Sequence, residues 1–384
     1  MRRLMPPGLE QKLAFLRDPR SFGEAAVRVE TIETHFAWVF LTARHAYKLK
    51  KPLRQALMDY RTVAARRKGC RAELVLNRRL APSVYLAVVP LSANAAGALS
   101  LGPDGKVIDW LVKMRRLPAS GLLDHILERQ SISDAEVDRL IALLVRFFRH
   151  ARRSPIAGKI YLGRLRRQIA ANRGALRAYG SQLRQALADE LADSQCRFIA
   201  LAGPEVAARG AHVVEGHGDL RPEHICVGRP LCVIDCVEFD RDLRLSDPVE
   251  ELAFLALETE RLGHGRLAAT LVRRYCEMRG DRVDEAIVHF YMSHRAATRA
   301  KLAAWHIGDP QFPDPRPWVA RAHSYLRDSL RHARRAVRLA GRLRLAVGGR
   351  PALEQGRKRN ATDDAAHGLG KKRRNGQDRE LVAL

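Results

Sequence analysis

Alternating hydrophobic and polar positions in the first third of the chain predict a small sheet. Residues 36–50 contain two β-rich runs on either side of a polar turn at 42–45, a pattern typical of a hairpin. Strand-like runs also occupy residues 84–91 and 107–114, joined by a segment that contains Gly and Asn. Residues 61–80 carry apolar side chains at helical spacing. The pattern therefore predicts a five-stranded antiparallel lobe with one helix.

The remainder of the chain has a mainly helical period. A Ser-x-x-Glu capping box at Ser133 and Glu136 marks one helix start. A β-rich patch interrupts the helical period at residues 213–237, and the last forty residues are basic, turn-rich and poor in apolar side chains. We therefore expect an α+β, bilobal protein. Its predicted parts are a β lobe over residues 1–117, a larger helical lobe over 118–344 and a disordered tail over 345–384.

The composition favours a cytoplasmic protein. No apolar stretch of the 384 residues approaches the roughly 18 positions of a membrane span, and no apolar segment follows the charged N-terminus as a secretory signal requires. Cys226, Cys232 and Cys236 lie in apolar runs, which indicates buried thiols. Paired Cys-x-x-Cys spacings, which a zinc site of that kind needs, do not occur in the sequence.

Two acidic residues at the ends of apolar runs are the candidates for chemistry. Asp219 follows the strand-like run that starts at residue 213, and Asp235 follows the next one. Phosphoryl transfer needs one carboxylate to accept the proton of the attacking hydroxyl and another to hold Mg²⁺ against the phosphates of ATP. The two residues fit these two roles.

The sequence around these residues resembles aminoglycoside phosphotransferases and related small-molecule kinases. The resemblance covers residues 30–305 and is carried by His217-Gly218-Asp219-Leu220, Ile234-Asp235, Glu33-Thr34-His35, Lys48-Leu49-Lys50-Lys51-Pro52, Glu73-Leu74-Val75, Lys113-Met114-Arg115-Arg116 and Asp247-Pro248-Val249-Glu250. These segments are most similar to an uncharacterised bacterial branch of the family. Some members of that branch have a C-terminal P-loop ATPase domain, whose Gly-x-x-x-x-Gly-Lys-Ser/Thr signature is absent here. We therefore expect the single-domain form.

The resemblance implies a protein-kinase-like fold and a role for each matched residue. Asp219 would be the catalytic base within a motif that includes His217, and Asp235 the Mg²⁺ ligand. Lys48 or Lys50 would contact the phosphates of ATP, and spacing cannot choose between them because both face the same side of one strand. Glu73 would pair with that lysine, and Met114 would belong to the hinge behind the adenine. Asp247 would brace the catalytic loop.

His224 departs from the family pattern, which has Asn as a second metal ligand at this position. Imidazole suits softer ions than Mg²⁺, so the substitution favours Mn²⁺ as an alternative metal. It also opens a second hypothesis, a pseudokinase or a nucleotide- or nucleic-acid-binding module without catalysis.

The net charge of +26 bears on the partners. Because the basic residues are spread along the whole chain, nucleic-acid binding through the basic tail is possible but not favoured. The acceptor is expected to be an anionic or neutral small molecule with a hydroxyl, since a basic protein is a poor match for polycationic aminoglycosides. Arg295, Arg299 and Lys301 lie on a predicted helix. The face that Arg295 and Arg299 share could line the acceptor pocket, but we interpret it as a solvated basic face.

Overall fold

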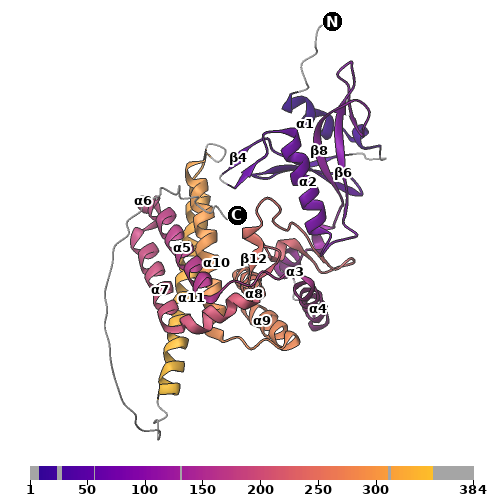
Figure 1. The fold of residues 1–384 in the computed structure, drawn as a ribbon. Helices are drawn as coiled ribbons and strands as arrows, with labels where there is room; N and C mark the ends of the chain where they lie inside the picture. Colours follow the sequence, from indigo (N-terminus) through magenta and orange to yellow (C-terminus); the bar gives the residue numbers. More distant parts are fainter. Residues whose placement is uncertain (1–7, 24–27, 56, 130–131, 310–312, 349–384) are drawn as a thin grey trace, which may run out of the picture.

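The computed structural model describes residues 8–23, 28–55, 57–129, 132–309 and 313–348. The chain forms a β lobe followed by a larger helical lobe, and the two meet after the last long strand (Figure 1). The predicted α+β, kinase-like class is confirmed. Most of the predicted tail, residues 349–384, lies outside the described residues, whereas residues 345–348 belong to the last helix.

The β lobe is an antiparallel sheet of six strands in the order β1-β2-β3-β8-β6-β7. The strands are β1 (Glu30–Glu33), β2 (Ala37–Leu41), β3 (His45–Lys50), β6 (Tyr85–Ala93), β7 (Leu99–Leu101) and β8 (Lys106–Arg115). The predicted hairpin is the β2–β3 pair. The sheet has one strand more than the five predicted. Its edge strands β1 and β7 both lie outside the predicted runs, and β7 forms inside the segment interpreted as a turn region.

Two helices cover this sheet, α1 (Leu9–Arg17) and α2 (Val63–Asn77). Thr62 caps α2 by accepting a hydrogen bond from the Ala65 amide. The predicted helix at 61–80 is therefore real, and it starts and ends slightly inside the predicted bounds. The short pair β4 (Arg54–Gln55) and β5 (Met58–Asp59) lies between β3 and α2.

The helical lobe packs around one large hydrophobic core. Its helices are α3 (Leu123–Arg129), α4 (Asp134–His150), α5 (Gly158–Arg177), α6 (Gly180–Leu183), α7 (Gln185–Ala208), α8 (Pro248–Arg261), α9 (Gly265–Arg279), α10 (Glu285–Trp305) and α11 (Arg316–Gly348). The predicted capping box of α4 is present, with Ser133 and Glu136 each bonding the other's backbone amide. Among the described residues, no helix combines the length and the apolar character needed to cross a bilayer.

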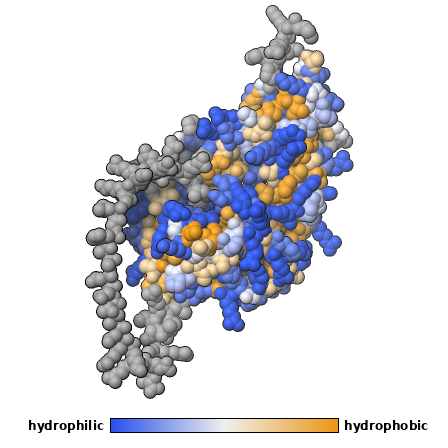
Figure 2. Space-filling view, in the orientation of Figure 1, coloured by the Kyte–Doolittle hydropathy of each residue, from blue (hydrophilic) through white to orange (hydrophobic). Residues whose placement is uncertain are grey.

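The predicted β-rich patch divides into very short strands that frame two loops. These are β9 (Val214–Glu215), β10 (Ile225–Cys226), β11 (Cys232–Val233) and β12 (Leu245–Ser246). Cys226, Cys232 and Cys236 are buried free thiols, as predicted. Hydrophilic side chains cover most of the face seen in Figure 2, and hydrophobic ones gather mainly over the β lobe.

Candidate active site

A cleft of about 1120 Å³ lies between the two lobes. Strands β2, β3 and β8 form one wall, and the segment 219–239 with the ends of α10 and α11 forms the other. Six of the eight predicted site residues line it: Lys48, Lys50, Met114, Asp219, His224 and Asp235. The other two, Glu73 and His217, are buried directly behind residues of the lining.

Both candidate lysines reach Glu73, but they differ in their second partner. Lys48 Nζ lies 3.0 Å from Glu73 Oε1 and 2.7 Å from Asp235 Oδ1, so it links the β lobe to the helical lobe. Lys50 Nζ lies 2.5 Å from Glu73 Oε2 and also contacts Glu238 Oε1. The Lys48 side chain is 16% exposed and that of Lys50 only 2%. Both lysines line the cleft, but Lys48 is the more exposed ammonium, and Lys50 is enclosed between carboxylates.

The charges in this network hold one another ionised. Burial acts against the charged form of every member, yet the carboxylates of Asp235 and Glu73 keep the pKa of Lys48 well above its ordinary value. Burial likewise disfavours ionised Asp235, but the Lys48 ammonium and the His224 imidazole hold the pKa of that carboxyl well below its usual range. Asp235 is therefore an anion throughout the neutral pH range.

The catalytic-loop candidate begins with two glycines that the packing requires. A Cβ on Gly216 would lie 2.0 Å from Glu251 Oε1, and Gly218 has φ +88°, where side chains are strained. Glu251, fully buried on α8, accepts hydrogen bonds from the backbone amides of His217 (2.9 Å) and Gly218 (3.1 Å). It fixes the loop from behind.

Asp247, which we expected to brace this loop, has other contacts. It caps α8 at the Val249 amide and forms a buried ion pair with Arg209 at 2.6 Å. Its effect on the loop is indirect, through the start of the helix that carries Glu251. The contact to the loop backbone is therefore made by Glu251, and no sequence pattern distinguishes this residue from the other acids of residues 247–251.

His217, predicted as a catalytic residue, is not among the described residues that line the cleft. Its Nε2 donates to the Ile234 carbonyl at 3.0 Å, and its Nδ1 accepts from the Asp219 amide at 3.3 Å. Burial lowers the pKa of His217 to about 3, so the ring is neutral. Because it joins the Asp219 loop to the Asp235 segment without reaching the cleft, His217 is a positioning residue.

Asp219 points into the cleft and is paired with an arginine that sequence reasoning missed. Arg221 Nη2 donates to Asp219 Oδ2 at 2.8 Å, and Arg221 also contacts Glu223. Burial raises the pKa of Asp219, but Arg221 and then His224 outweigh it and leave the pKa below its ordinary value. Only the alternation of charges in Asp219-Leu220-Arg221-Pro222-Glu223 could have suggested the pair of Asp219 and Arg221.

His224 stands between the two acids. Its Nδ1 lies 2.8 Å from the Asp219 carbonyl oxygen, which can only accept, so Nδ1 carries the proton. Its Nε2 lies 3.8 Å from Asp235 Oδ2 and 3.3 Å from Arg221 Nη2. This second nitrogen therefore faces the carboxylate of Asp235.

The β lobe holds the segment that presents Asp235. Asp235 has φ +62°, an uncommon conformation for a residue with a side chain. Its amide donates to the Tyr85 hydroxyl at 3.2 Å, and the next amide, of Cys236, donates to Asn77 Oδ1 at 2.9 Å. These contacts from β6 and α2 fix the carboxylate opposite Lys48.

An apolar region of the cleft adjoins the end of β8. Met114 pairs with Ala46 on one side and with Tyr85 on the other, and Ala46 pairs with Leu41 on the next strand. Side chains of this region, together with residues 115–117, line the cleft. The arrangement provides a flat apolar wall beside an interlobe connection, where the hinge was expected.

The basic residues of α10 do not form a solvated face, and that interpretation was wrong. Arg295 bonds to Glu250 at 2.9 Å, and Lys301 is 5% exposed. Arg299 lines the cleft and lies over the Tyr325 ring at 5.7 Å. Helical spacing placed the arginines on one face correctly, but that face packs against α8 and α11, and the sequence alone does not show which face is covered.

Comparison with known proteins identifies the family. The model described as the phosphotransferase enzyme family matches residues 47–288, more than half of the chain. The chain belongs to this family. Uncharacterized protein Rv2004c of Mycobacterium tuberculosis is 30% identical to this phosphotransferase-family chain over 334 residues, which cover 84% of the chain and 62% of that protein. Uncharacterized protein Mb2027c of Mycobacterium bovis gives the same values. The chain thus spans about 62% of the length of these curated relatives.

Solved structures agree with the family fold. The wild-type aminoglycoside 2'-phosphotransferase-IIIa in its GDP complex has a TM-score of 0.50 and 17% identity, over 83% of this chain and 98% of that one. A choline kinase from Cryptosporidium parvum has a TM-score of 0.49 and 10% identity, over 88% and 96% of the two chains. At such identities the first match supports the kinase-like fold alone.

Proposed function

We propose that this protein transfers the γ-phosphoryl group of ATP to a hydroxyl of a small anionic molecule. The observation that carries the proposal is the meeting of Asp219, Asp235 and Lys48 in one interlobe cleft of a phosphotransferase-family chain. These are the three charges that phosphoryl transfer requires: a base, a metal ligand and a phosphate-binding cation.

Asp219 is proposed as the base. Its pKa, held below the ordinary value, keeps it ionised and able to accept a proton at neutral pH. Arg221 donates a hydrogen bond to one of its carboxylate oxygens, Oδ2. The attacking hydroxyl would bond to Asp219, which orients it and accepts its proton.

Lys48 is proposed as the phosphate ligand in preference to Lys50. It faces the cleft, and Glu73 holds it from behind, so its charge is available where the phosphates lie. Lys50 keeps Glu73 in place from the protein side. The Glu73 carboxylate thus pairs with both lysines, for which we propose different roles.

The side chains of Asp235 and His224 are suited to act as ligands of a divalent cation. The proton on His224 Nδ1 is bonded to a backbone carbonyl, as is usual for metal-ligating histidines, and Nε2 faces Asp235. When bound, Mg²⁺ or Mn²⁺ would neutralise phosphate charge. A nitrogen and an oxygen ligand together suit Mn²⁺ at least as well as Mg²⁺.

The acceptor is proposed to be anionic because the helical lobe contributes three arginines to the lining of the cleft: Arg221, Arg299 and Arg321. Glu258 lies close enough to the first two to offset part of their charge. A polycation would meet these guanidinium groups unfavourably. An anionic group on the acceptor would pair with Arg299 while its hydroxyl reaches Asp219.

The test is an acceptor screen that follows ADP formation from ATP, with GTP in parallel, in Mg²⁺ or Mn²⁺. We expect turnover with anionic hydroxyl compounds and none with polycationic ones. Arg299→Gln should raise the KM for the acceptor roughly 10- to 100-fold, the value of a lost charge-assisted hydrogen bond, and leave the KM for ATP unchanged. Arg273→Gln, at an exposed arginine of α9, is the matched control. Preference for polycations would refute the acceptor class, and nucleotide binding without any turnover would favour the non-catalytic alternative.

A further inference from the structure

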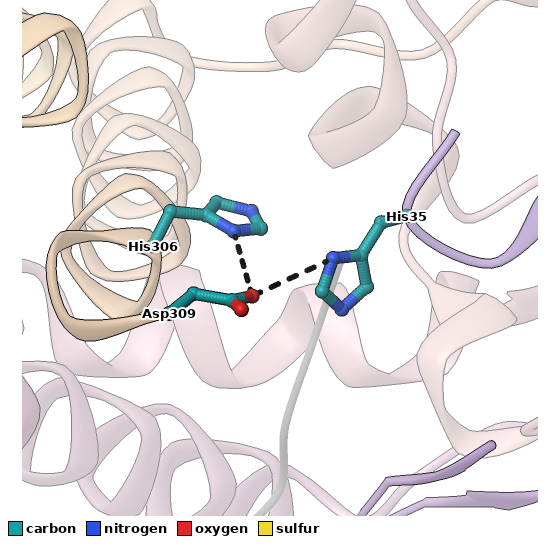
Figure 3. A group of neighbouring side chains, drawn as sticks. All are labelled: His35, His306 and Asp309. Atoms are coloured by element: carbon teal, nitrogen blue, oxygen red, sulfur yellow. Dashed lines mark ion pairs between the residues drawn. The ribbon is translucent and has the colours of Figure 1, made fainter. Parts of the chain in front are cut away.

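A second cluster of potential ligands lies in the same cleft, away from Asp219 and Asp235. It consists of His35, His306 and Asp309 (Figure 3), whose ligand atoms all lie within 4.8 Å of one another. His35 stands in the turn between β1 and β2, and the other two follow the end of α10. His35 belongs to the Glu33-Thr34-His35 motif, to which the proposed reaction assigns no role.

The geometry of the cluster suits an ion in its centre. Asp309 Oδ2 is 3.9 Å from His35 Nδ1 and 3.7 Å from His306 Nδ1, so both nitrogens face one carboxylate oxygen from beyond hydrogen-bond length. Zinc ligands at about 2.0–2.2 Å from a tetrahedral ion are about 3.4 Å apart. The Asp309 carboxylate oxygen therefore needs to approach each of these two nitrogens by only about half an ångström or less.

Contacts around the two imidazoles fix their orientation. The His35 ring meets Phe36 edge-on at 4.5 Å, and the His306 ring packs on Trp318 at 4.1 Å. His35 Nε2 lies 3.3 Å from the amide nitrogen of Gln55. This contact holds the His35 ring at the nitrogen other than the one that faces Asp309.

The electrostatics also favour a metal. Burial lowers the pKa of both His35 and His306, which keeps the rings neutral at neutral pH. A positive charge acts on each imidazole, that of Lys51 on His35 and that of Arg321 on His306, and Lys51 is itself paired with Glu33 at 2.6 Å. Two imidazoles and one carboxylate match Zn²⁺ better than Mg²⁺ or Ca²⁺, which prefer oxygen.

We propose that His35, His306 and Asp309 form a Zn²⁺ site that fastens the β1–β2 turn of the β lobe to the helical lobe. Because the ligands come from both lobes, the ion binds only the arrangement in which the cleft is closed at this end. All three residues line the cleft, so a fourth coordination position faces its interior. The site does not depend on the proposed phosphoryl transfer, since it can be measured without nucleotide.

The test uses the full chain, stripped of metal with a chelator and titrated with Zn²⁺ alone. One of the Zn²⁺ equivalents that wild-type protein binds should be bound at least tenfold more weakly by His35→Ala, His306→Ala or Asp309→Asn, and Co²⁺ should give the visible absorption of a four-coordinate site. His125→Ala, at a partly exposed histidine of α3, should match the wild type. Unchanged affinity and stoichiometry in the three variants, with melting curves that show them folded, would overturn the site.

A second readout tests the link between the lobes. Zn²⁺ should slow hydrogen exchange of the backbone amides over residues 34–37 in the wild type and leave it unchanged in Asp309→Asn. Asp309 is distant in sequence from that turn. A zinc-dependent change of hydrogen exchange in the turn that is lost in Asp309→Asn therefore shows that the ion connects the two lobes. Zinc binding without any change in exchange at 34–37 would overturn the fastening role.

Discussion

The two lysines of β3 should respond in opposite ways to the same substitution. Replacement by Met keeps most of the aliphatic stem and removes the charge. In Lys50→Met, Glu73 keeps only Lys48, and Glu238 keeps only the Tyr60 hydroxyl at 3.0 Å. Removing one partner of a buried ion pair costs about 3–5 kcal/mol. We expect the free energy of unfolding to fall by that amount, while the folded protein binds ATP within a few-fold of wild type.

Lys48→Met should have little effect on stability and a large effect on ATP. Glu73 retains Lys50, and the Asp235 side chain is 46% exposed, so water can solvate it. The loss of one charged hydrogen bond to phosphate is worth about 1.5–3 kcal/mol, a rise of roughly 10- to 150-fold in the KM for ATP. Denaturant titration and steady-state kinetics on both variants measure the two effects. A Lys48→Met protein with wild-type KM, or a Lys50→Met protein with wild-type stability, would refute this division of roles.

Three further outcomes follow from the site. His224→Asn should preserve or raise turnover with Mg²⁺ and lower the ratio of Mn²⁺ to Mg²⁺ activity, because it restores an oxygen ligand; complete loss of activity would give the histidine a role of its own. Glu251→Gln places an amide NH₂ against backbone donors of the catalytic loop, and kcat should fall at least tenfold with the KM for ATP little changed. His217→Gln tests the buried imidazole: its pKa of about 3 lies below the ordinary 6.5, so the unfolded chain binds a proton that the folded chain does not, and stability is lost as pH falls from about 6.5. The stability deficit of the variant should therefore shrink between pH 7 and pH 5, by up to about 2 kcal/mol, and a constant deficit in denaturation curves would contradict it.

Local pattern was sufficient for the elements with strong periodicity. The β2–β3 hairpin, α2 and the capped start of α4 could be predicted because turn residues, helical spacing and capping side chains are all local signals. The edge strands β1 and β7 gave no such signal, since β1 is largely exposed and β7 has only three residues. Their place in the sheet depends on pairing with distant strands.

The residues of the candidate site also differ in whether the sequence alone could identify them. Motif order indicated Asp219, Asp235 and Glu73, but the choice between Lys48 and Lys50 needed distances to Asp235 and Glu238, which are about 190 residues away in the chain. Glu251 could not be distinguished from other acids of α8 because only the fold shows which one meets the loop amides. Long-range contacts of this kind leave no spacing pattern.

The most direct measurement is nucleotide turnover by the wild type and Asp219→Asn under matched ATP occupancy. Binding is first titrated so that both proteins are equally loaded, and ADP formation is then followed with Mg²⁺ and with Mn²⁺ in the presence of an accepted hydroxyl compound. We expect the variant to bind ATP within a few-fold of wild type and to turn over at least about 100-fold more slowly, as for the loss of a positioned base. Equal rates in the two proteins, or a wild type that turns over no nucleotide with either metal, would contradict phosphoryl transfer at Asp219.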